Sequence, residues 1–155
     1  MNMYSIVFAA VLMCVFWGNG AAQEKKGGFV PSVFWESAVD RGIMLVSPME
    51  MIIVDSKGNR HEKILATEDV YSAHLSPDGK KLAYTTAIGV RLAQVDTGQS
   101  YLVMTGYCDY LRWSADGMSL LFAIGEYKKD EIPVVFAFKF FWADRDGKNL
   151  KQVYP

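Results

Sequence analysis

The stretch that decides the fold is Leu75-Ser76-Pro77-Asp78-Gly79-Lys80-Lys81-Leu82-Ala83-Tyr84. Within it, Pro77 pre-sets the φ angle for the first corner of a type I turn, and the Asp78 carboxylate is suited to accept hydrogen bonds from nearby main-chain NH groups. Gly79 then takes a left-handed conformation at little cost, as in a hairpin with a G1 bulge. The stretch therefore predicts a tight turn between two antiparallel strands.

The same pattern occurs again further along the chain, as Trp113-Ser114-Ala115-Asp116-Gly117-Met118-Ser119-Leu120-Leu121-Phe122. Aligning the chain on Asp40, Asp78 and Asp116 gives a spacing of 38 residues both times. The first unit is degenerate, and its turn aligns Ser37 with Ser76 and Gly42 with Gly79. A fixed period of this size is typical of repeat architectures, in which each unit packs on its neighbours.

A second turn signal follows the first in every unit, at Asp55-Ser56-Lys57-Gly58, Asp96-Thr97-Gly98 and Asp144-Arg145-Asp146-Gly147. The residues assigned to structural turns are Ser76, Pro77, Asp78, Gly79, Ser114, Asp116, Gly117, Asp96, Gly98, Asp144 and Gly147. The runs after the first turn are short and apolar on both sides, which predicts strands buried on both faces. We therefore expect an all-β protein. The remaining strands are expected at residues 51–54, 63–66, 90–95, 100–104, 134–142 and 150–154.

These motifs resemble the TolB-type β-propeller repeat, a relative of the Trp-Asp repeat propellers. The resemblance covers residues 33–155 and implies antiparallel four-stranded blades, with units at about 33–66, 70–104 and 108–155. Propellers usually close with about four to eight blades, so three units do not complete a conventional ring. Three explanations stay open: pairing with a copy of itself or another protein, truncation of a longer propeller, or an open arrangement with capped end blades.

The N-terminal segment predicts export. Ile6 to Trp17 is an apolar run, too short to span a membrane, and small residues follow it up to Ala22. We expect residues 1–22 to be a signal peptide cut before Gln23, with residues 23–32 as a linker and a periplasmic or secreted mature protein. No stable membrane span is expected after cleavage, although the missing Lys or Arg near the start leaves a retained N-terminal anchor as the alternative.

Few residues suggest chemistry. His74, beside Leu75 on an expected inner strand, is the candidate for lining a central channel, with a structural histidine as the alternative, whereas His61 is expected on the surface. Cys108 is expected to be a buried apolar residue. No spacing typical of a metal site, phosphate loop or nucleophile elbow occurs, so we expect no metal, no cofactor and no catalytic residue. The net charge of -1 gives no basic face for nucleic acid.

Two further segments of the third unit are notable, and the second of them has two interpretations. Residues 126–133 are charged and end in proline, which predicts a solvent loop. The strand after them is aromatic, and either core packing or a partner-docking surface explains it; its aromatic residues are Phe136, Phe138, Phe140, Phe141 and Trp142.

The resemblance gives architecture and little chemistry. We expect a non-catalytic, exported interaction or scaffolding module of the cell envelope, with a protein partner or self-association. The alternative is a propeller fragment or accessory chain of an exported prolyl-oligopeptidase-like peptidase.

Overall fold

The computed structural model describes residues 29, 31–36, 39–127 and 135–154, with the backbone alone for Tyr127, Val135 and Phe136. In this part of the chain the secondary structure is all β, as predicted, and no helix is long and apolar enough to cross a membrane. The expected signal peptide and most of the expected linker lie outside the described residues. The strands are β1 (Ser32–Glu36), β2 (Arg41–Ser47), β3 (Glu50–Asp55), β4 (Arg60–Leu65), β5 (Val70–Leu75), β6 (Lys81–Thr86), β7 (Gly89–Gln94), β8 (Ser100–Thr105), β9 (Cys108–Trp113), β10 (Ser119–Tyr127), β11 (Val135–Asp144) and β12 (Lys151–Tyr154).

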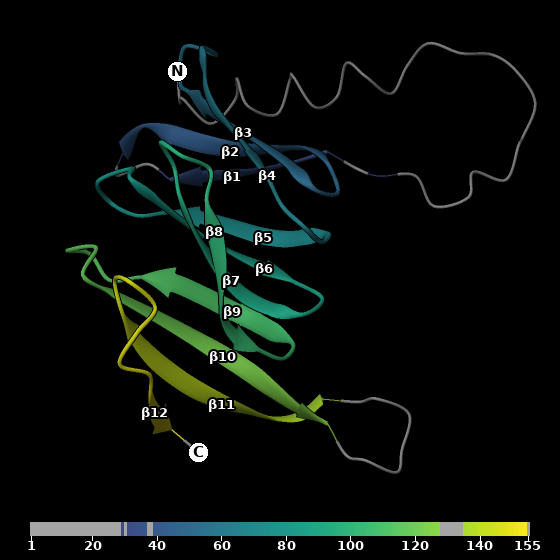
Figure 1. Cartoon of the computed structure of the whole chain (residues 1–155), viewed down its shortest axis with the longest axis vertical. Coiled ribbons are helices and arrows are strands. Elements are labelled where there is room, and N and C mark those ends of the chain that lie inside the picture. The colour runs from purple at the N-terminus through teal and green to yellow at the C-terminus, as the bar shows by residue number, and fades with distance from the viewer. Residues whose placement is uncertain (1–28, 30, 37–38, 128–134, 155) are drawn as a thin grey trace, which may run out of the picture.

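The strands form three four-stranded antiparallel sheets, each built from consecutive strands. We call them blade 1 (β1–β4), blade 2 (β5–β8) and blade 3 (β9–β12). Figure 1 shows the blades stacked face to face, with blade 2 between the other two and no closed ring. The inner strands β1, β5 and β9 contact one another in order along the stack. The expected architecture of about three four-stranded antiparallel blades, as an incomplete or open propeller, is confirmed for the described residues.

Each junction between blades holds a separate hydrophobic core. Between blades 1 and 2, Ile43, Met51 and Ile53 pack with Leu75 and Leu82. Between blades 2 and 3 the core has these buried members: Ala83, Val90, Leu92, Cys108, Leu111, Leu120, Phe122, Ile124 and Ala143. Strand β6 is buried along its whole length because both of its faces meet another blade. This explains why the sequence of β6 lacks the alternation of a half-exposed strand.

The first hairpin turn of blade 1 differs from the sequence alignment. Gly42 does not sit in a turn: it lies in β2, paired with Trp35, and Asp40 is the residue with a left-handed φ of 51°. A β-carbon on Gly42 would come within 2.5 Å of the Trp35 ring, so glycine is needed there because the indole lies against the main chain. The alignment of Gly42 with Gly79 and Gly117 is therefore wrong. Ser37 lies outside the described residues.

The third unit also departs from expectation at its insertion. Strand β10 runs through Glu126, which pairs with Ala137 on β11, so the charged loop cannot begin at Glu126. The ion pair between Lys139 and Glu126 joins the two strands at this point. Tyr127 also belongs to β10, and the remaining residues of the expected loop, 128–133, lie outside the described residues.

The aromatic strand β11 uses its two faces differently. Phe141 points toward blade 2 and stacks on Phe122, with ring centroids 5.8 Å apart. Phe140 lies on the opposite face, between the rings of Tyr110 and Tyr154. One face of β11 is thus core, as one interpretation predicted, while the other face points away from the stack.

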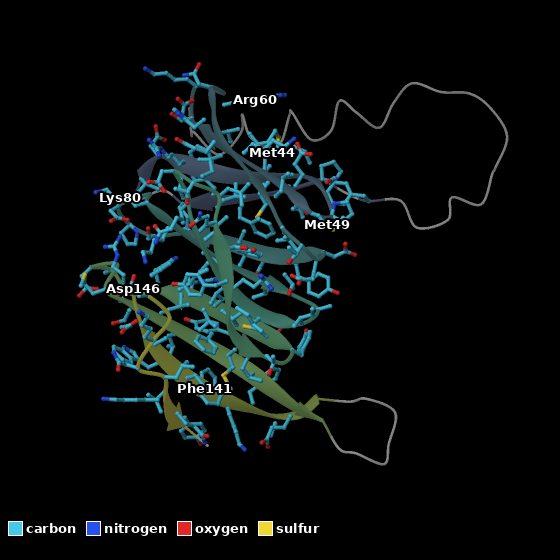
Figure 2. All side chains as sticks on the ribbon, in the orientation of Figure 1. Met44, Met49, Arg60, Lys80, Phe141 and Asp146 are labelled. Atoms are coloured by element: carbon cyan, nitrogen blue, oxygen red, sulfur yellow. The ribbon has the colours of Figure 1, made fainter. Side chains whose placement is uncertain are left out.

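Polar contacts at the hairpin turns join blades 2 and 3 along one side of the stack. Lys81 forms an ion pair with Asp146, and the Arg145 guanidinium donates a hydrogen bond of 2.6 Å to Asp78. The Tyr101 hydroxyl donates to the main-chain carbonyl of Asp146 at 2.8 Å. Figure 2 shows Asp146 on the same side of the stack as Lys80, whose turn belongs to blade 2. These contacts fix which turn of one blade meets which turn of the next.

Replacement of Gly79 tests the turn on which the repeat depends. Its φ is +68°, and a β-branched side chain is strained there, so Gly79→Val is expected to lower the free energy of unfolding by ~1–2 kcal/mol. Gly79→Asn is the matched control, because asparagine adopts the left-handed region more readily than valine. Urea unfolding gives the measurement. Equal stability of the valine variant and the native protein would contradict the turn assignment.

Candidate functional site

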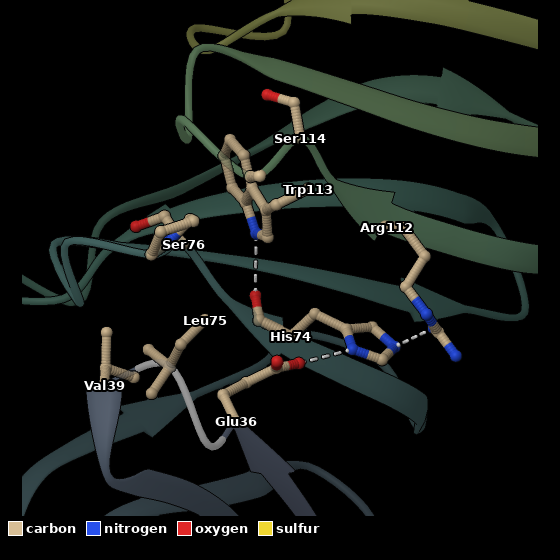
Figure 3. A pocket seen from close by; sticks show the side chains of 10 residues that line it. Glu36, Val39, His74, Leu75, Ser76, Arg112, Trp113 and Ser114 are labelled. Carbon is tan, nitrogen blue, oxygen red and sulfur yellow. Dashed lines mark hydrogen bonds and ion pairs between the residues drawn. The ribbon is translucent and has the colours of Figure 1, made fainter.

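Three charged or titratable side chains meet where the inner strands of the three blades end. Glu36 is the last residue of β1, while His74 and Arg112 are the penultimate residues of β5 and β9. His74 pairs with Ala83, and Arg112 pairs with Leu121, so these two hold matching positions in their blades. The stacking of the blades therefore places one side chain from each blade in a single line (Figure 3).

His74 is the centre of this line. Its Nδ1 atom lies 2.8 Å from Oε1 of Glu36, and its Nε2 atom lies 2.9 Å from Nη1 of Arg112. A guanidinium has no acceptor, so Arg112 must donate to Nε2. Nε2 then carries the lone pair, and Nδ1 carries the proton that is donated to Glu36. The geometry thus specifies one neutral tautomer of the imidazole.

The electrostatics favour the same neutral form. The His74 side chain is 14% exposed, and this burial is the main cause that lowers the pKa of His74 below 6.5. The hydrogen bond to Glu36 acts in the opposite direction, and the charge of Arg112 lowers the pKa further. A neutral imidazole between a carboxylate and a guanidinium is therefore the resting state of the site at neutral pH.

Neighbouring groups hold Arg112 in place. Its Nη1 atom also donates to the main-chain carbonyl of Leu111 at 2.7 Å, and the guanidinium lies over the Tyr110 ring, 5.4 Å from the centroid. A cation over an aromatic face gains electrostatic attraction from the ring quadrupole. Arg112 as a residue is still exposed, so its positive charge stays open to solvent.

A pocket of about 240 Å³ adjoins the line of side chains. Its apolar lining comes from Val39, Leu75, Pro77 and Trp113. The Trp113 indole Nε1 donates to the main-chain carbonyl of His74 at 3.0 Å, which fastens blade 3 to blade 2 beside the pocket (Figure 3). The pocket combines an apolar wall with a carboxylate, an imidazole and a guanidinium.

The two serines that line the pocket are bound into their turns. The Ser76 hydroxyl donates to Asp78 at 2.6 Å and accepts from the main-chain NH of Lys81. The Ser114 hydroxyl donates to Asp116 at 2.5 Å and accepts from the main-chain NH of Ser119. Both nitrogens of His74 are occupied by other residues, so the imidazole does not activate either hydroxyl in this arrangement.

The assigned turn residues lie in or directly beside hairpin turns, with Asp144 as the last residue of β11 and with Gly79, Gly98, Gly117 and Gly147 all at left-handed φ. The hydrogen bond from Ser76 is the main cause that holds the pKa of Asp78 well below its usual range, and Ser114 does the same for Asp116. Pro77 packs beside Gly117 of the next blade. The turns are thus electrostatically stabilised as well as geometrically set.

The second turns depend on the last residue of the third strand. Asp144 accepts from the main-chain NH groups of Asp146 and Lys148, which lowers its pKa, and Asp55 makes the same kind of contacts in blade 1. In blade 2 this position is Gln94, not Asp96. Asp96 therefore lies inside its turn and does not match Asp144.

Other candidate residues lie apart from this site. His61 is exposed and lies 3.2 Å from Asp55, at the edge of blade 1. Cys108 is buried, and this burial raises the pKa of its thiol to about 11, so the thiolate nucleophile is scarce at neutral pH. Within the described ranges, no group of His, Cys, Asp and Glu side chains could hold a metal ion.

Sequence reasoning singled out His74 but missed Glu36 and Arg112. Arg112 follows His74 by 38 residues, which is the repeat period, so aligning the whole inner strand instead of its turn would have found it. Glu36 gives no such signal, because the register of blade 1 matches Phe34, and not Glu36, to His74.

No protein-family model and no curated protein matches the chain, so the TolB-type resemblance stays a prediction. Solved structures do match. The tricorn protease is 9% identical over 83% of this chain and 18% of its own, with a TM-score of 0.54. Acylaminoacyl peptidase of Pyrococcus horikoshii is 16% identical over 79% of this chain and 22% of its own, with a TM-score of 0.52.

A 6-phosphogluconolactonase candidate of Bacteroides fragilis has the same TM-score of 0.52, at 20% identity over 79% of this chain and 37% of its own. This chain spans between 18% and 37% of the chains of these three structures. At such low identities the structural similarity shows a shared propeller fold alone.

Acidification tests the neutral state of His74. The folded state lowers the pKa of this histidine. Below pH 6.5 the unfolded chain therefore binds a proton that the folded chain resists, and the free energy of unfolding decreases as the pH is lowered. His74→Asn, which retains a donor for Glu36, should show a shallower fall between about pH 7.5 and about pH 5.5. One proton accounts for at most about 1.4 kcal/mol per pH unit. Urea unfolding of both proteins at each pH gives the comparison, and parallel curves would contradict the assignment.

Proposed function

We propose that this chain is a non-catalytic propeller-repeat module that binds protein through the outward faces of its end blades. The outward face of blade 1 is the face of β1–β4 that points away from blade 2. The outward face of blade 3 is the corresponding face of β9–β12. The single observation that carries the proposal is that both outward faces are apolar, although nothing in the described part of the chain packs against them.

The outward face of blade 1 is built by alternation along its strands. Val33 and Trp35 are 60% and 44% exposed, while Phe34 between them packs toward blade 2. Val33 pairs with Met44, and Met44 pairs with Ile52 on the next strand. Both Met44 and Ile52 are only half-buried. Large exposed apolar surfaces on folded proteins mark interaction sites, so this face is suited to dock another blade-like surface.

The outward face of blade 3 is aromatic. Tyr110 pairs with Ala123, Ala123 with Phe140, and Phe140 with Tyr154, which makes a continuous row across four strands. Tyr110 is 41% exposed and Tyr154 is 63% exposed. Aromatic residues are enriched in the centres of protein interfaces, which fits the partner-docking interpretation of this strand.

The pocket beside Glu36, His74 and Arg112 supports a binding role over a catalytic one. Its histidine, carboxylate and guanidinium hydrogen-bond one another, and its serine hydroxyls hold turns together. Arg112 keeps an exposed positive charge beside the apolar Trp113, which suits an acidic or carboxylate-bearing group of a bound protein.

A second candidate function is that the chain is the propeller part of a larger peptidase, or its accessory chain. Its support is the likeness to the two peptidase structures, of which the chain spans only a small share. Sequencing the coding region beyond codon 155 distinguishes the two. A downstream α/β-hydrolase domain with its nucleophile motif would favour the peptidase interpretation.

We also propose that the protein is exported to the cell envelope or the medium, and this makes its own prediction. Residues 1–22 have the composition of a signal peptide, so the mature protein isolated from the cell envelope or the medium should begin at Gln23. N-terminal sequencing of the protein from each cell fraction gives the measurement. Recovery of the intact N-terminus in the membrane fraction would support the retained anchor instead and contradict export as a soluble protein.

Charging the outward face of blade 1 tests the binding role. Trp35→Asp is expected to abolish the stable complex of this protein, because a carboxylate at the centre of an apolar contact is desolvated without a partner. Ile88→Asp is the matched control. The exposed fraction of Ile88, 46%, is similar to the 44% of Trp35, but Ile88 lies in the β6–β7 turn of blade 2.

The measurement is in-cell cross-linking followed by mass determination of the purified adduct, whether the partner is a copy or another protein. Equal adduct yields from the native protein and from both variants, or no adduct from any of them, would contradict the proposal.

A further inference from the structure

We infer that the protein covering the two outward faces is a second copy of this chain, with blade 3 of each copy docked on blade 1 of the other. This inference rests on the proposed function and names its partner. The internal junction between blades 2 and 3 provides the template, because strand registers assign a matching position in blade 1 or blade 3 to each of its residues.

The matching positions follow from the strand pairs. Arg41, Lys81 and Ser119 are each the first residue of the second strand in their blades. They pair with Asp55, Gln94 and Asp144, each the last residue of the third strand. Positions between these pairs and the first register shift of each strand pair are matched by counting from them.

Trp35 then holds in blade 1 the position that Trp113 holds in blade 3. Trp35 pairs with Gly42 and Trp113 pairs with Leu120, and both partners are the second residue of their strands. At the internal junction, Trp113 Nε1 donates to the main-chain carbonyl of His74. The residue that matches His74 in blade 3 is Arg112. In the docked pair, the Trp35 indole therefore donates to the main-chain carbonyl of Arg112 in the second copy.

Side-chain sizes on the two outward faces are complementary. At the internal junction, blade 2 presents the small residues Ala83 and Val90, and blade 3 fills the space with Phe122 and Phe141. At the two outward faces both sets change in size. The matching residues of blade 3, Leu121 and Phe140, are larger than Ala83 and Val90, and those of blade 1, Met44 and Ile52, are smaller than Phe122 and Phe141. The gain in volume on one face is thus offset by the loss on the other, as close packing requires.

The charged residues at the turns also differ between the internal junction and the free ends. At the internal junction Lys81 meets Asp146, which lies two residues after the end of the third strand. The matching residues at the free ends are Ser119 on blade 3 and the exposed Lys57 on blade 1. A lysine at both positions would repel. Instead the lysine is on blade 1, as Lys57, and the position that it faces on blade 3 is the neutral Ser119. The Asp116 carboxylate lies in the turn next to Ser119.

Two copies supply six blades, within the range of about four to eight at which propellers close. The two junctions are related by one two-fold axis along the channel, so both outward faces of both copies are covered and no third copy can add. The two lines of Glu36, His74 and Arg112 then lie around one shared channel.

Transplanting the internal ion pair to the free ends tests this docking. Ser119→Lys alone should weaken the dimer about tenfold, because a lysine then faces Lys57 at two junctions, and Lys57→Asp alone should weaken it similarly against Asp116. The double variant recreates the Lys81–Asp146 pair at both junctions and should bind at least as tightly as the native chain. The dissociation constants are measured by light scattering and sedimentation equilibrium on the purified chain, with circular dichroism to verify folding.

The outcomes separate this inference from the proposed function. A native dimer with the non-additive pattern of the double variant supports the inference. Additive effects of the two substitutions, or a folded native monomer at micromolar concentration, overturn it. If the monomer still forms a cross-linked complex that depends on Trp35, another protein supplies the missing blades and the proposed function stands. If it forms no such complex, both are overturned.

Discussion

Each four-stranded blade has two apolar faces, and covering both of them is the constraint on which the structure depends. Strand β6 meets it completely, because blades lie on both sides of it. The hydrophobic effect is roughly proportional to the apolar area removed from water, so every junction between blades stabilises the stack. Blades 1 and 3 meet the constraint on one side only. The composition of their outward faces, apolar but exposed, is the direct result.

Polar groups in the turns decide how the blades align once burial has brought them together. Serine and aspartate side chains hold the first turn of blades 2 and 3, and the first turn of blade 2 then meets the second turn of blade 3. The pairing of Arg145 with Asp78 and of Lys81 with Asp146 makes the contact specific in position. Apolar surfaces alone would allow the blades to slide, whereas paired charges at one edge favour a single arrangement.

Most of the fold could be predicted from the sequence because local chemistry determines it. The left-handed glycines and the runs without alternation identify strands and turns through short-range effects. The prediction failed at Gly42, because the glycine there makes room for the Trp35 ring of the paired strand and does not form a turn. It also failed at Glu126, because strand length depends on pairing with β11 and not on the charge of the residue.

The site was harder to predict for the same reason. Glu36, His74 and Arg112 come from three blades, and only the stacking of the blades brings them together. The period of the repeat relates two of them, but nothing local marks any of the three as a member of a cluster. Trp113 was visible as part of a motif, yet its hydrogen bond to the His74 carbonyl depends on the neighbouring blade.

Every blade consists of four consecutive strands, so no blade borrows a strand from another part of the chain. The hydrogen-bonded strand ladders therefore stay within a blade, and the junctions are joined mainly by side chains, beside the main-chain hydrogen bond from Val70 to Pro48. An assembly built on such blades can come apart and form again without breaking a β-ladder. Its lifetime is set by side-chain packing, hydrogen bonds and ion pairs at the junctions, and its subunits can exchange while each remains folded.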